Sequence, residues 1–158
     1  MNNTNTDPFQ GMKVYSPELI AGFRDEAFFM SNYSPAEVVL DGVLYPTTEN
    51  AFQAAKTIDK NARIPFQTCS PAKSKELGRA VKLRSDWEEI RIELMEYLLL
   101  QKFSHPELRA KLLATGDAVL EERNYWGDKT WGTDLHGFGQ NLLGKMLMKI
   151  RENIRTNG

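Results

Sequence analysis

The apolar residues of this chain recur mainly with the spacing of helices, in five segments. The first four begin near residues 46, 70, 85 and 104, each at a proline or a capping residue, and the fifth runs from about 141 to 154. The longest begins at Ser85-Asp86-Trp87-Glu88, which has the pattern of a capping box, and is expected to end near Phe103. Its apolar stripe consists of Trp87, Ile90, Leu94, Tyr97 and Leu98.

Shorter apolar runs predict the strands. Val38–Leu40 and Val43–Tyr45 flank Asp41-Gly42, a strong hairpin signal because both positions accept positive φ. A short strand or a loop is expected within residues 14–25, and a short strand within residues 118–122. Few strands beside five helices predict an α+β fold, dominated by helices, with a small hairpin or sheet. We expect a single domain over residues 13–158, behind a polar, disordered tail at residues 1–12.

Composition and charge narrow the classes of function. The chain has 158 residues and a formal net charge of -1, so it has no global attraction to nucleic acid or to an anionic membrane. Cys69 is the only cysteine, which excludes an intramolecular disulfide, and the two histidines do not have the spacing of zinc ligands. We find no signal peptide or membrane span, and expect a cytoplasmic protein without a metal or a cofactor.

The most informative stretch runs from Tyr45 to Lys56. Pro46 and two threonines predict a helix start, and Glu49 then falls in the first turn, where negative charge is favoured. At about 100° per residue, Glu49, Gln53 and Lys56 share one stripe with Phe52 at its edge. The opposite side is expected to consist of Ala51, Ala54, Ala55 and Ile58. A polar stripe is most often a solvated face, and the alternative is that it lines a cleft.

Two further regions could contact a ligand. The segment from 125 to 139 carries two tryptophans and four glycines, and long irregular segments are often functional. Trp126 can stack on a base or merely cover the core, and Gly137-Phe-Gly139 before a helix is a weak phosphate signal. Arg79 belongs to a group of five basic residues between 73 and 84, which is either a solvated face or a source of phosphate contacts. Cys69 is expected to be a small core residue.

An ordered set of short motifs runs along the chain. The first half supplies Ser31-Asn32-Tyr33, Pro46-Thr47, Glu49, Phe52, Gln53, Lys56, Ser70-Pro71, Ala72-Lys73, Gly78-Arg79, Trp87 and Lys102-Phe103. The second half supplies Leu113-Ala-Thr-Gly116, Leu120-Glu121, Trp126-Gly127, Gly137-x-Gly-x-Asn-x-Leu-Gly144 and Leu147-Met148-x-x-Arg151. Taken in order, these motifs resemble the NADAR family, also called YbiA-like. They cover roughly residues 22–151, and each is modest alone while the ordered set is specific. The chain departs from the family in a short segment between Glu121 and Trp126 and in a longer one after Gly127.

The resemblance implies an N-glycosidase, a hydrolase without a metal, that releases ribose from an exocyclic amine. The implied substrates are ribosylamino-pyrimidine phosphates, which are riboflavin intermediates, or ADP-ribose on guanine in nucleic acid. No membrane and no obligate protein partner are implied. The alternative is a module that binds ADP-ribose or a nucleotide without catalysis.

Breaking a ribosyl–amine bond requires stabilisation of a cationic sugar carbon and a proton for the leaving amine. Glu49 suits both tasks, and a desolvated Lys56 amine could instead attack C1 and form a Schiff base. Glu49 and Lys56 are therefore the predicted catalytic residues, in a cleft shared with Trp87, Trp126 and Asn141. The predicted substrate-binding residues are Asn32, Phe52, Gln53, Arg79, Trp87, Trp126, Gly127 and Asn141.

Overall fold

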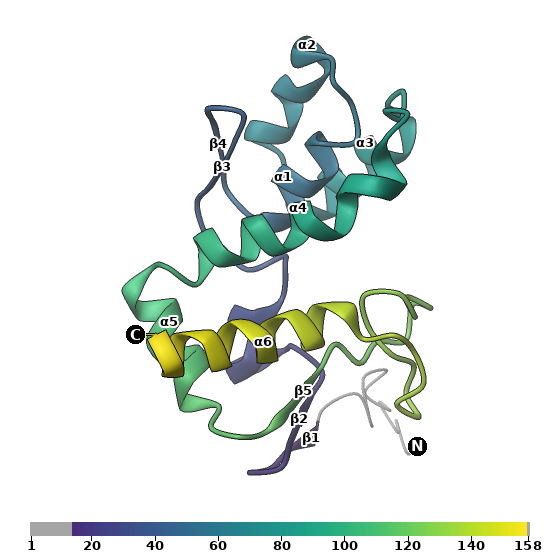
Figure 1. Ribbon diagram of the computed structural model, residues 1–158. Coiled ribbons are helices and arrows are strands. Elements are labelled where there is room, and N and C mark those ends of the chain that lie inside the picture. The colour runs from purple at the N-terminus through teal and green to yellow at the C-terminus, as the bar shows by residue number, and fades with distance from the viewer. Residues whose placement is uncertain (1–13, 158) are drawn as a thin grey trace, which may run out of the picture. The chain divides into compact units, whose positions relative to one another are not determined.

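The computed structural model describes residues 14–157, which form two compact units (Figure 1). The sheet unit contains the described residues up to Ser31 and those from Lys111 onward. The hairpin unit is Asn32–Ala110. The expected tail at residues 1–12 lies outside the described residues, and the single domain expected over residues 13–158 stays a prediction.

The sheet unit is built on three short strands. β1 (Val14–Tyr15) pairs antiparallel with β2 (Leu19–Ala21), and β2 pairs in parallel with β5 (Val119–Glu121). Between β2 and β5 along the sequence, this unit also contains the 3₁₀ helix η1 (Asp25–Met30). The helix α5 (Pro106–Ala114) precedes β5 and crosses the boundary between the two units in the sequence.

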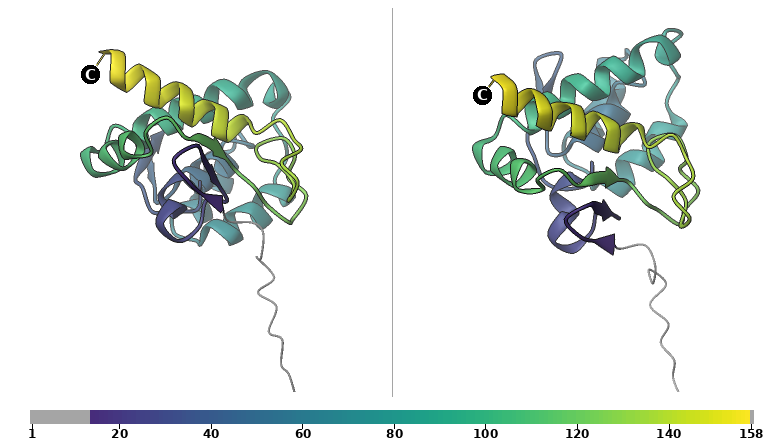
Figure 2. Two further views of the ribbon diagram at one scale, coloured as in Figure 1. Left: turned by 90° about the horizontal axis from the view of Figure 1, so that it is seen from below. Right: turned by 60° about the horizontal axis from the view of Figure 1, so that its bottom comes forward.

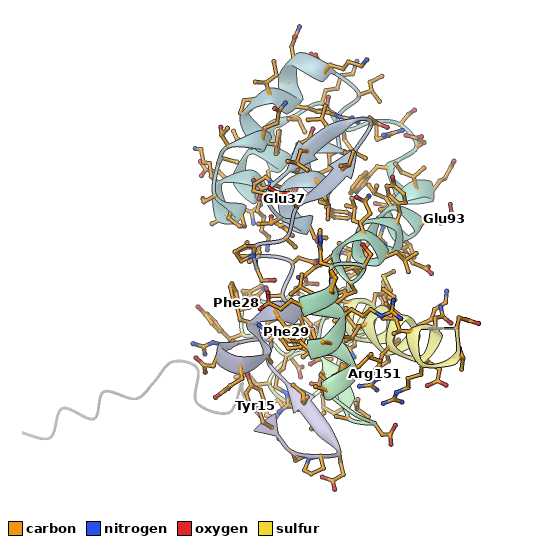
Figure 3. All side chains as sticks on the ribbon, turned by 90° about the vertical axis from the view of Figure 1, so that its left-hand side faces the viewer. Tyr15, Phe28, Phe29, Glu37, Glu93 and Arg151 are labelled. Carbon is orange, nitrogen blue, oxygen red and sulfur yellow. The ribbon has the colours of Figure 1, made fainter. Side chains whose placement is uncertain are left out.

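The last helix, α6 (Leu142–Asn157), lies beside β5 (Figure 2). Its buried apolar residues are Leu143, Met146, Leu147 and Ile150. The buried Arg151, labelled in Figure 3, donates hydrogen bonds to Thr115 Oγ1 and to the carbonyl of Ala118, both at 2.8 Å. These bonds join α6 to the turn before β5, so the geometry of that turn depends on a helix far away in sequence.

The hairpin unit contains the predicted β-hairpin and most of the helices. β3 (Val38–Leu40) and β4 (Val43–Tyr45) pair antiparallel around Asp41 and Gly42, which have φ of 49° and 78°. The helices that follow are α1 (Thr48–Ala54), α2 (Lys60–Arg63), the 3₁₀ helix η2 (Ile64–Gln67), α3 (Pro71–Ala80) and α4 (Trp87–Lys102). Arg63 ties α2 to the hairpin, since its Nη1 lies 2.6 Å from Asp41 Oδ2.

The helix-dominated α+β fold predicted from the sequence is confirmed. Two local predictions are wrong. The predicted capping box at Ser85 does not form, because α4 begins at Trp87 and Asp86 rather than Ser85 is at the N-cap position. The Asp86 carboxylate does not cap the helix either, since it pairs with Arg84, whose Nε lies 2.6 Å from Asp86 Oδ1. Ile58 is 72% exposed, because α1 ends at Ala54 and residue 58 follows it in a loop.

The short helices η1, α2 and η2 were not among the predicted elements. They span only four to six residues, too few to show a helical repeat of apolar positions. Among residues 14–157, no helix is both long enough and apolar enough to cross a membrane.

Candidate active site

The first turn of α1 is fixed by a small set of hydrogen bonds. Thr47 caps the helix, since its Oγ1 accepts from the backbone N–H of Asn50 at 3.0 Å and donates to Asn50 Oδ1 at 2.6 Å. Asn50 Nδ2 then donates to the carbonyls of Phe66 and Cys69, at 2.9 and 2.8 Å. These bonds anchor α1 to η2 and to the loop before α3, so the helix has one orientation in the hairpin unit.

Glu49 and Gln53 are buried side chains on this anchored helix. Glu49 is 8% exposed and Gln53 is 5% exposed, so the interpretation of the polar stripe as a solvated face is wrong for both. Gln53 Nε2 donates a hydrogen bond to Glu49 Oε1 at 2.9 Å. Gln53 Oε1 is buried and has no hydrogen-bond partner in the described part of the chain. The buried Glu49 carboxylate therefore accepts a hydrogen bond from a neutral amide one helical turn away.

Lys56 follows α1 at the end of the same stripe. Its side chain is half-buried, and burial is the main cause that lowers its pKa below the usual lysine value. The charge of Glu49 raises the pKa of Lys56 again, while Arg79 and Lys75 lower it further. The Lys56 amine is therefore neutral more often than the amine of an exposed lysine, even though the Glu49 carboxylate favours its charged form.

Two aromatic rings accompany the stripe. The Phe52 and Trp87 rings lie 4.9 Å apart between centroids, with an angle of 57° between their planes. Lys56 Nζ lies 5.9 Å from the centroid of the Trp87 ring, within the range of a cation–π contact. Trp87 is only 6% exposed, so its packing role is established, and stacking on a substrate base stays a prediction.

The structure places the other predicted residues of the hairpin unit as follows. The carbonyl of Asn32 accepts the backbone N–H of Glu49 at 3.1 Å, and its side chain is buried. Arg79 is exposed on α3. The hairpin unit thus brings Asn32, Glu49, Phe52, Gln53, Lys56, Arg79 and Trp87 onto α1 and the elements that pack around it.

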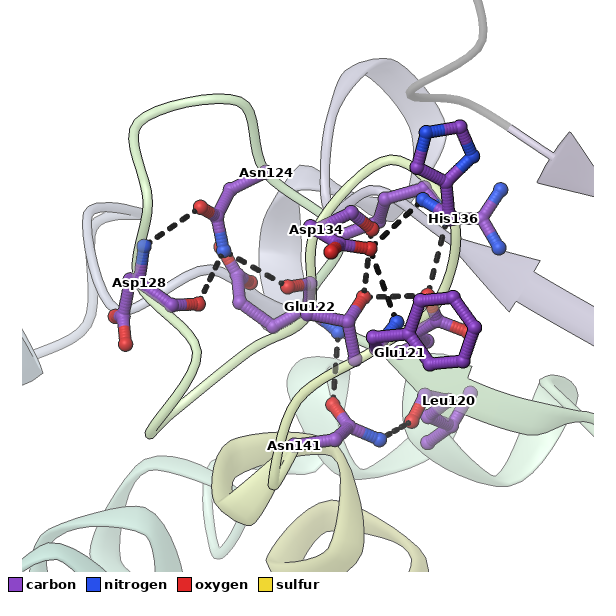
Figure 4. A network of polar contacts seen from close by, with 11 residues as sticks. Leu120, Glu121, Glu122, Asn124, Asp128, Asp134, His136 and Asn141 are labelled. Atoms are coloured by element: carbon purple, nitrogen blue, oxygen red, sulfur yellow. Dashed lines mark hydrogen bonds and ion pairs between the residues drawn. The ribbon is translucent and has the colours of Figure 1, made fainter.

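Trp126, Gly127 and Asn141 belong to the sheet unit, in and after the irregular segment. Figure 4 shows Asn141 in the network of polar contacts around that segment. Trp126 is 51% exposed and makes an edge contact with Tyr125. Asn141 Oδ1 accepts the backbone N–H of Glu122 at 3.0 Å, and its Nδ2 donates to the carbonyl of Leu120 at 2.9 Å. A cleft that Trp126 and Asn141 share with Glu49 stays a prediction.

The irregular segment is held by side chains that act on nearby backbone. Asn124 accepts from the N–H of Asp128 and donates to the carbonyls of Glu122 and Asp128. Asp134 Oδ1 accepts from the N–H groups of His136 and Phe138, at 2.9 and 3.0 Å. The segment therefore has no helix or strand but has a defined conformation. Figure 4 shows these hydrogen bonds as dashed lines.

Sequence reasoning missed the roles of Asn50 and Gly78. Asn50 lies three residues after the capping Thr47, and that spacing was the one signal of its contact. Gly78 lies against Gln53, and no local sequence pattern predicts a contact between residues of two different helices. Within residues 14–157 no group of three or more His, Cys, Asp or Glu side chains is placed to hold a metal ion.

Comparison with known proteins assigns this fold and site to a class. N-glycosidase YbiA of Escherichia coli (strain K12) is 39% identical over 128 residues, which are 78% of this chain and 79% of that protein. The NMR structure of the E. coli protein YbiA has a TM-score of 0.77 and 35% identity, covering 92% of this chain and 89% of that one. A riboflavin biosynthesis protein of Vibrio vulnificus is 33% identical over 82% of this chain, but over only 36% of its own length.

By class the chain is an N-glycosidase, a hydrolase of N-glycosyl bonds. A model of the NADAR domain matches residues 19–155, nearly the whole described chain. The chain therefore belongs to the NADAR domain family, and the family membership predicted from the ordered motifs is confirmed.

Proposed function

We propose that this N-glycosidase hydrolyses the bond between ribose and an exocyclic amine, where the ribose carries a phosphate or is part of ADP-ribose. The observation that carries the proposal is the buried Glu49 carboxylate, bonded to Gln53 and electrostatically coupled to a half-buried Lys56. The riboflavin biosynthesis relative supports a ribosylamino-pyrimidine phosphate as one substrate. ADP-ribosylated guanine is the other candidate implied by the family resemblance.

Glu49 acts as the general acid and base in this proposal. Its protonated carboxyl donates a proton to the exocyclic nitrogen as the bond from that nitrogen to C1 breaks. The carboxylate that remains stabilises the cationic sugar, and then accepts a proton from the water that adds to C1. Burial supports this role, because a carboxylate that is shielded from water interacts more strongly with a developing positive charge.

Lys56 offers a second route through the same stripe. After the glycosylamine opens to its imine, the neutral lysine amine attacks C1 and displaces the amine of the base. Water then hydrolyses the resulting lysine imine and releases the sugar. The lowered pKa of Lys56 supports this route, since the attacking amine must be neutral.

The remaining residues are proposed to bind the substrate. Phe52 and Trp87 offer aromatic surface, Asn32 and Gln53 offer amides, and the exposed Arg79 offers a guanidinium for a phosphate. Trp126, Gly127 and Asn141 of the sheet unit are also proposed substrate-binding residues. The cytoplasmic location and the absence of an obligate partner stay predictions from the sequence.

The test is product detection by mass spectrometry over a panel of ribosylated amines, which includes ribosylamino-pyrimidine phosphates and ADP-ribosylated guanosine. Glu49→Gln keeps the shape of the side chain and should lower turnover by about 10²–10⁴-fold, the usual cost of losing an acid–base group. Glu88→Gln, at an exposed position of α4, is the matched control and should retain full turnover. Full activity of Glu49→Gln on a confirmed substrate would refute its catalytic role.

Lys56→Arg separates the two routes, because it preserves the charge but cannot form an imine. Lys56→Ala should lower turnover severely if the Schiff-base route operates, and borohydride should then trap a sugar adduct on Lys56. Near-normal turnover of Lys56→Arg without an adduct would leave Lys56 an electrostatic role and Glu49, acting through water, as the catalyst.

A further inference from the structure

Gly78 lies in the interior of α3, where an alanine would normally be the better residue. Its φ is not in the positive range, so the backbone of α3 does not require glycine at this position. Alanine is favoured over glycine in a helix interior by about 1 kcal/mol. The reason for a glycine must therefore be sought in what lies beside it.

The space beside Gly78 is occupied by Gln53 of α1. A Cβ added at residue 78 would lie 2.0 Å from Gln53 Oε1, 3.0 Å from its Cδ and 3.3 Å from its Cβ. Both residues are buried, and Gln53 is 5% exposed. A methyl group at residue 78 therefore forces the amide of Gln53 to turn away or the two helices to separate.

The amide of Gln53 is not free to turn without a consequence for Glu49. Its other end, Nε2, donates the 2.9 Å hydrogen bond to Glu49 Oε1. A carboxylate held at one oxygen has a restricted rotation about its last bond, and the donor stabilises its charged form. The position of the Glu49 carboxylate thus depends on the Gln53 amide, and the Gln53 amide can take this position because residue 78 has no side chain.

We propose that Gly78 and Gln53 are positioning residues for catalysis: Gly78 leaves the space on α3 in which Gln53 orients the carboxylate of Glu49. This inference rests on the proposed role of Glu49. It gives α3 a positioning function, separate from the phosphate contact proposed for Arg79 on the same helix.

The experiment compares Gly78→Ala, Gln53→Ala and the double variant with the wild-type protein. Each variant should lower kcat by about 10- to 100-fold, the effect of losing a hydrogen bond to a charged group. In the double variant the new methyl occupies the space that the amide leaves. Its Tm should therefore recover towards that of Gln53→Ala, and its kcat should equal that of Gln53→Ala rather than the product of the two losses.

A pH profile separates positioning from general damage to the fold. Loss of the Gln53 donor removes a stabilising contact of the charged carboxylate, so the titration midpoint of Glu49 should move to higher pH in Gly78→Ala and Gln53→Ala alike. Carbon-13 NMR of the glutamate carboxyl groups measures this midpoint directly. Ala72→Ser adds one heavy atom at an exposed position of α3, and should change neither the midpoint nor kcat.

Wild-type kcat in Gly78→Ala, or multiplied losses in the double variant, would overturn the inference. If Gly78→Ala does not fold, Gln53→Met tests the same step, because methionine keeps the length of the side chain and lacks the donor. Unchanged kcat and an unchanged Glu49 midpoint in Gln53→Met would also overturn it. If instead the wild-type protein acts on none of the ribosylated amines, the proposed function fails, whereas the NMR midpoints still decide whether Gly78 positions Glu49.

Discussion

Each of the two units contains a helix glycine that faces a side-chain amide, and the two contacts differ in kind. On α3, a Cβ at Gly78 would meet the side chain of Gln53. On α6, a Cβ at Gly144 would lie 2.1 Å from the carbonyl oxygen of Leu120 and 2.5 Å from both polar atoms of Asn141. The first glycine lies against the end of a flexible side chain, and the second lies against backbone.

The two amides also have different partners. Asn141 uses both polar atoms on the backbone of residues 120 and 122, so it acts as a fixed link between β5 and the start of α6. Gln53 uses one polar atom on an ionisable side chain, and its other polar atom has no partner in the described part of the chain. An amide bonded to backbone mainly holds a fold together, whereas an amide bonded to a buried carboxylate can control chemistry.

The largest expected effect is on stability, in Gly144→Ala. The new methyl would meet the Leu120 carbonyl, which cannot rotate away, so the free energy of unfolding should fall by about 3 kcal/mol, the upper part of the range for overpacking. Gly78→Ala should cost less, because Gln53 can turn aside. Urea denaturation measures both, with Lys145→Ala as an exposed control on α6. Equal losses in the free energy of unfolding of Gly144→Ala and Gly78→Ala would contradict the difference between a contact with backbone and a contact with a flexible side chain.

Asn141→Ala should lower the free energy of unfolding by about 2 kcal/mol, because the backbone groups of residues 120 and 122 lose their partners. Asn141 has a φ of 51°, which adds strain for alanine. Asn141→Gly removes the same bonds without that strain, so the difference in the free energy of unfolding between the two variants measures the strain of the backbone. The KM of the folded variants tests the predicted substrate contact of Asn141: a rise supports substrate binding, and an unchanged KM leaves Asn141 a structural residue.

The pH dependence of turnover should reflect Lys56 if its amine is the nucleophile. The rate should rise about tenfold per pH unit while the Lys56 amine is mostly protonated, and reach a plateau above its pKa. Because burial lowers the pKa of Lys56, this plateau should begin at a lower pH than the usual pKa of lysine. In Glu49→Gln the plateau of the residual activity should begin at lower pH, because the charge that raises this pKa is gone. Stopped assays from pH 6 to 10 test this, and a flat profile would argue for catalysis by Glu49 and water alone.

The local signals of the chain proved reliable where the contact lies within a few residues. Thr47 caps α1 and Ser70 caps α3, each by accepting the N–H of the residue three positions later. Asp41-Gly42 forms the predicted hairpin turn with positive φ at both positions. These features depend on backbone conformations that the residue types themselves favour.

Local signals failed where a neighbour competed or where a helix ended early. Ser85-Asp86-Trp87-Glu88 has the pattern of a capping box, but α4 begins one residue too late for Ser85 to cap it, and the carboxylate of Asp86 pairs with Arg84 instead. Helical spacing assigned Ile58 to a packed side, although the chain leaves the helix after Ala54. In both cases the residue pattern is typical of the predicted feature, but a competing charge or an early helix end decided the outcome.

The sequence by itself determined the family, the α+β class and the shared face of Glu49 and Gln53, because these follow from residue order and helical spacing. Only the tertiary structure decided that Glu49 and Gln53 are buried, since burial depends on what η2, α3 and α4 place around α1. It also decided the parallel pairing of β2 with β5 and the contact of Gly78 with Gln53. Such contacts join residues far apart in sequence, and a single residue type does not record which distant partner it will meet.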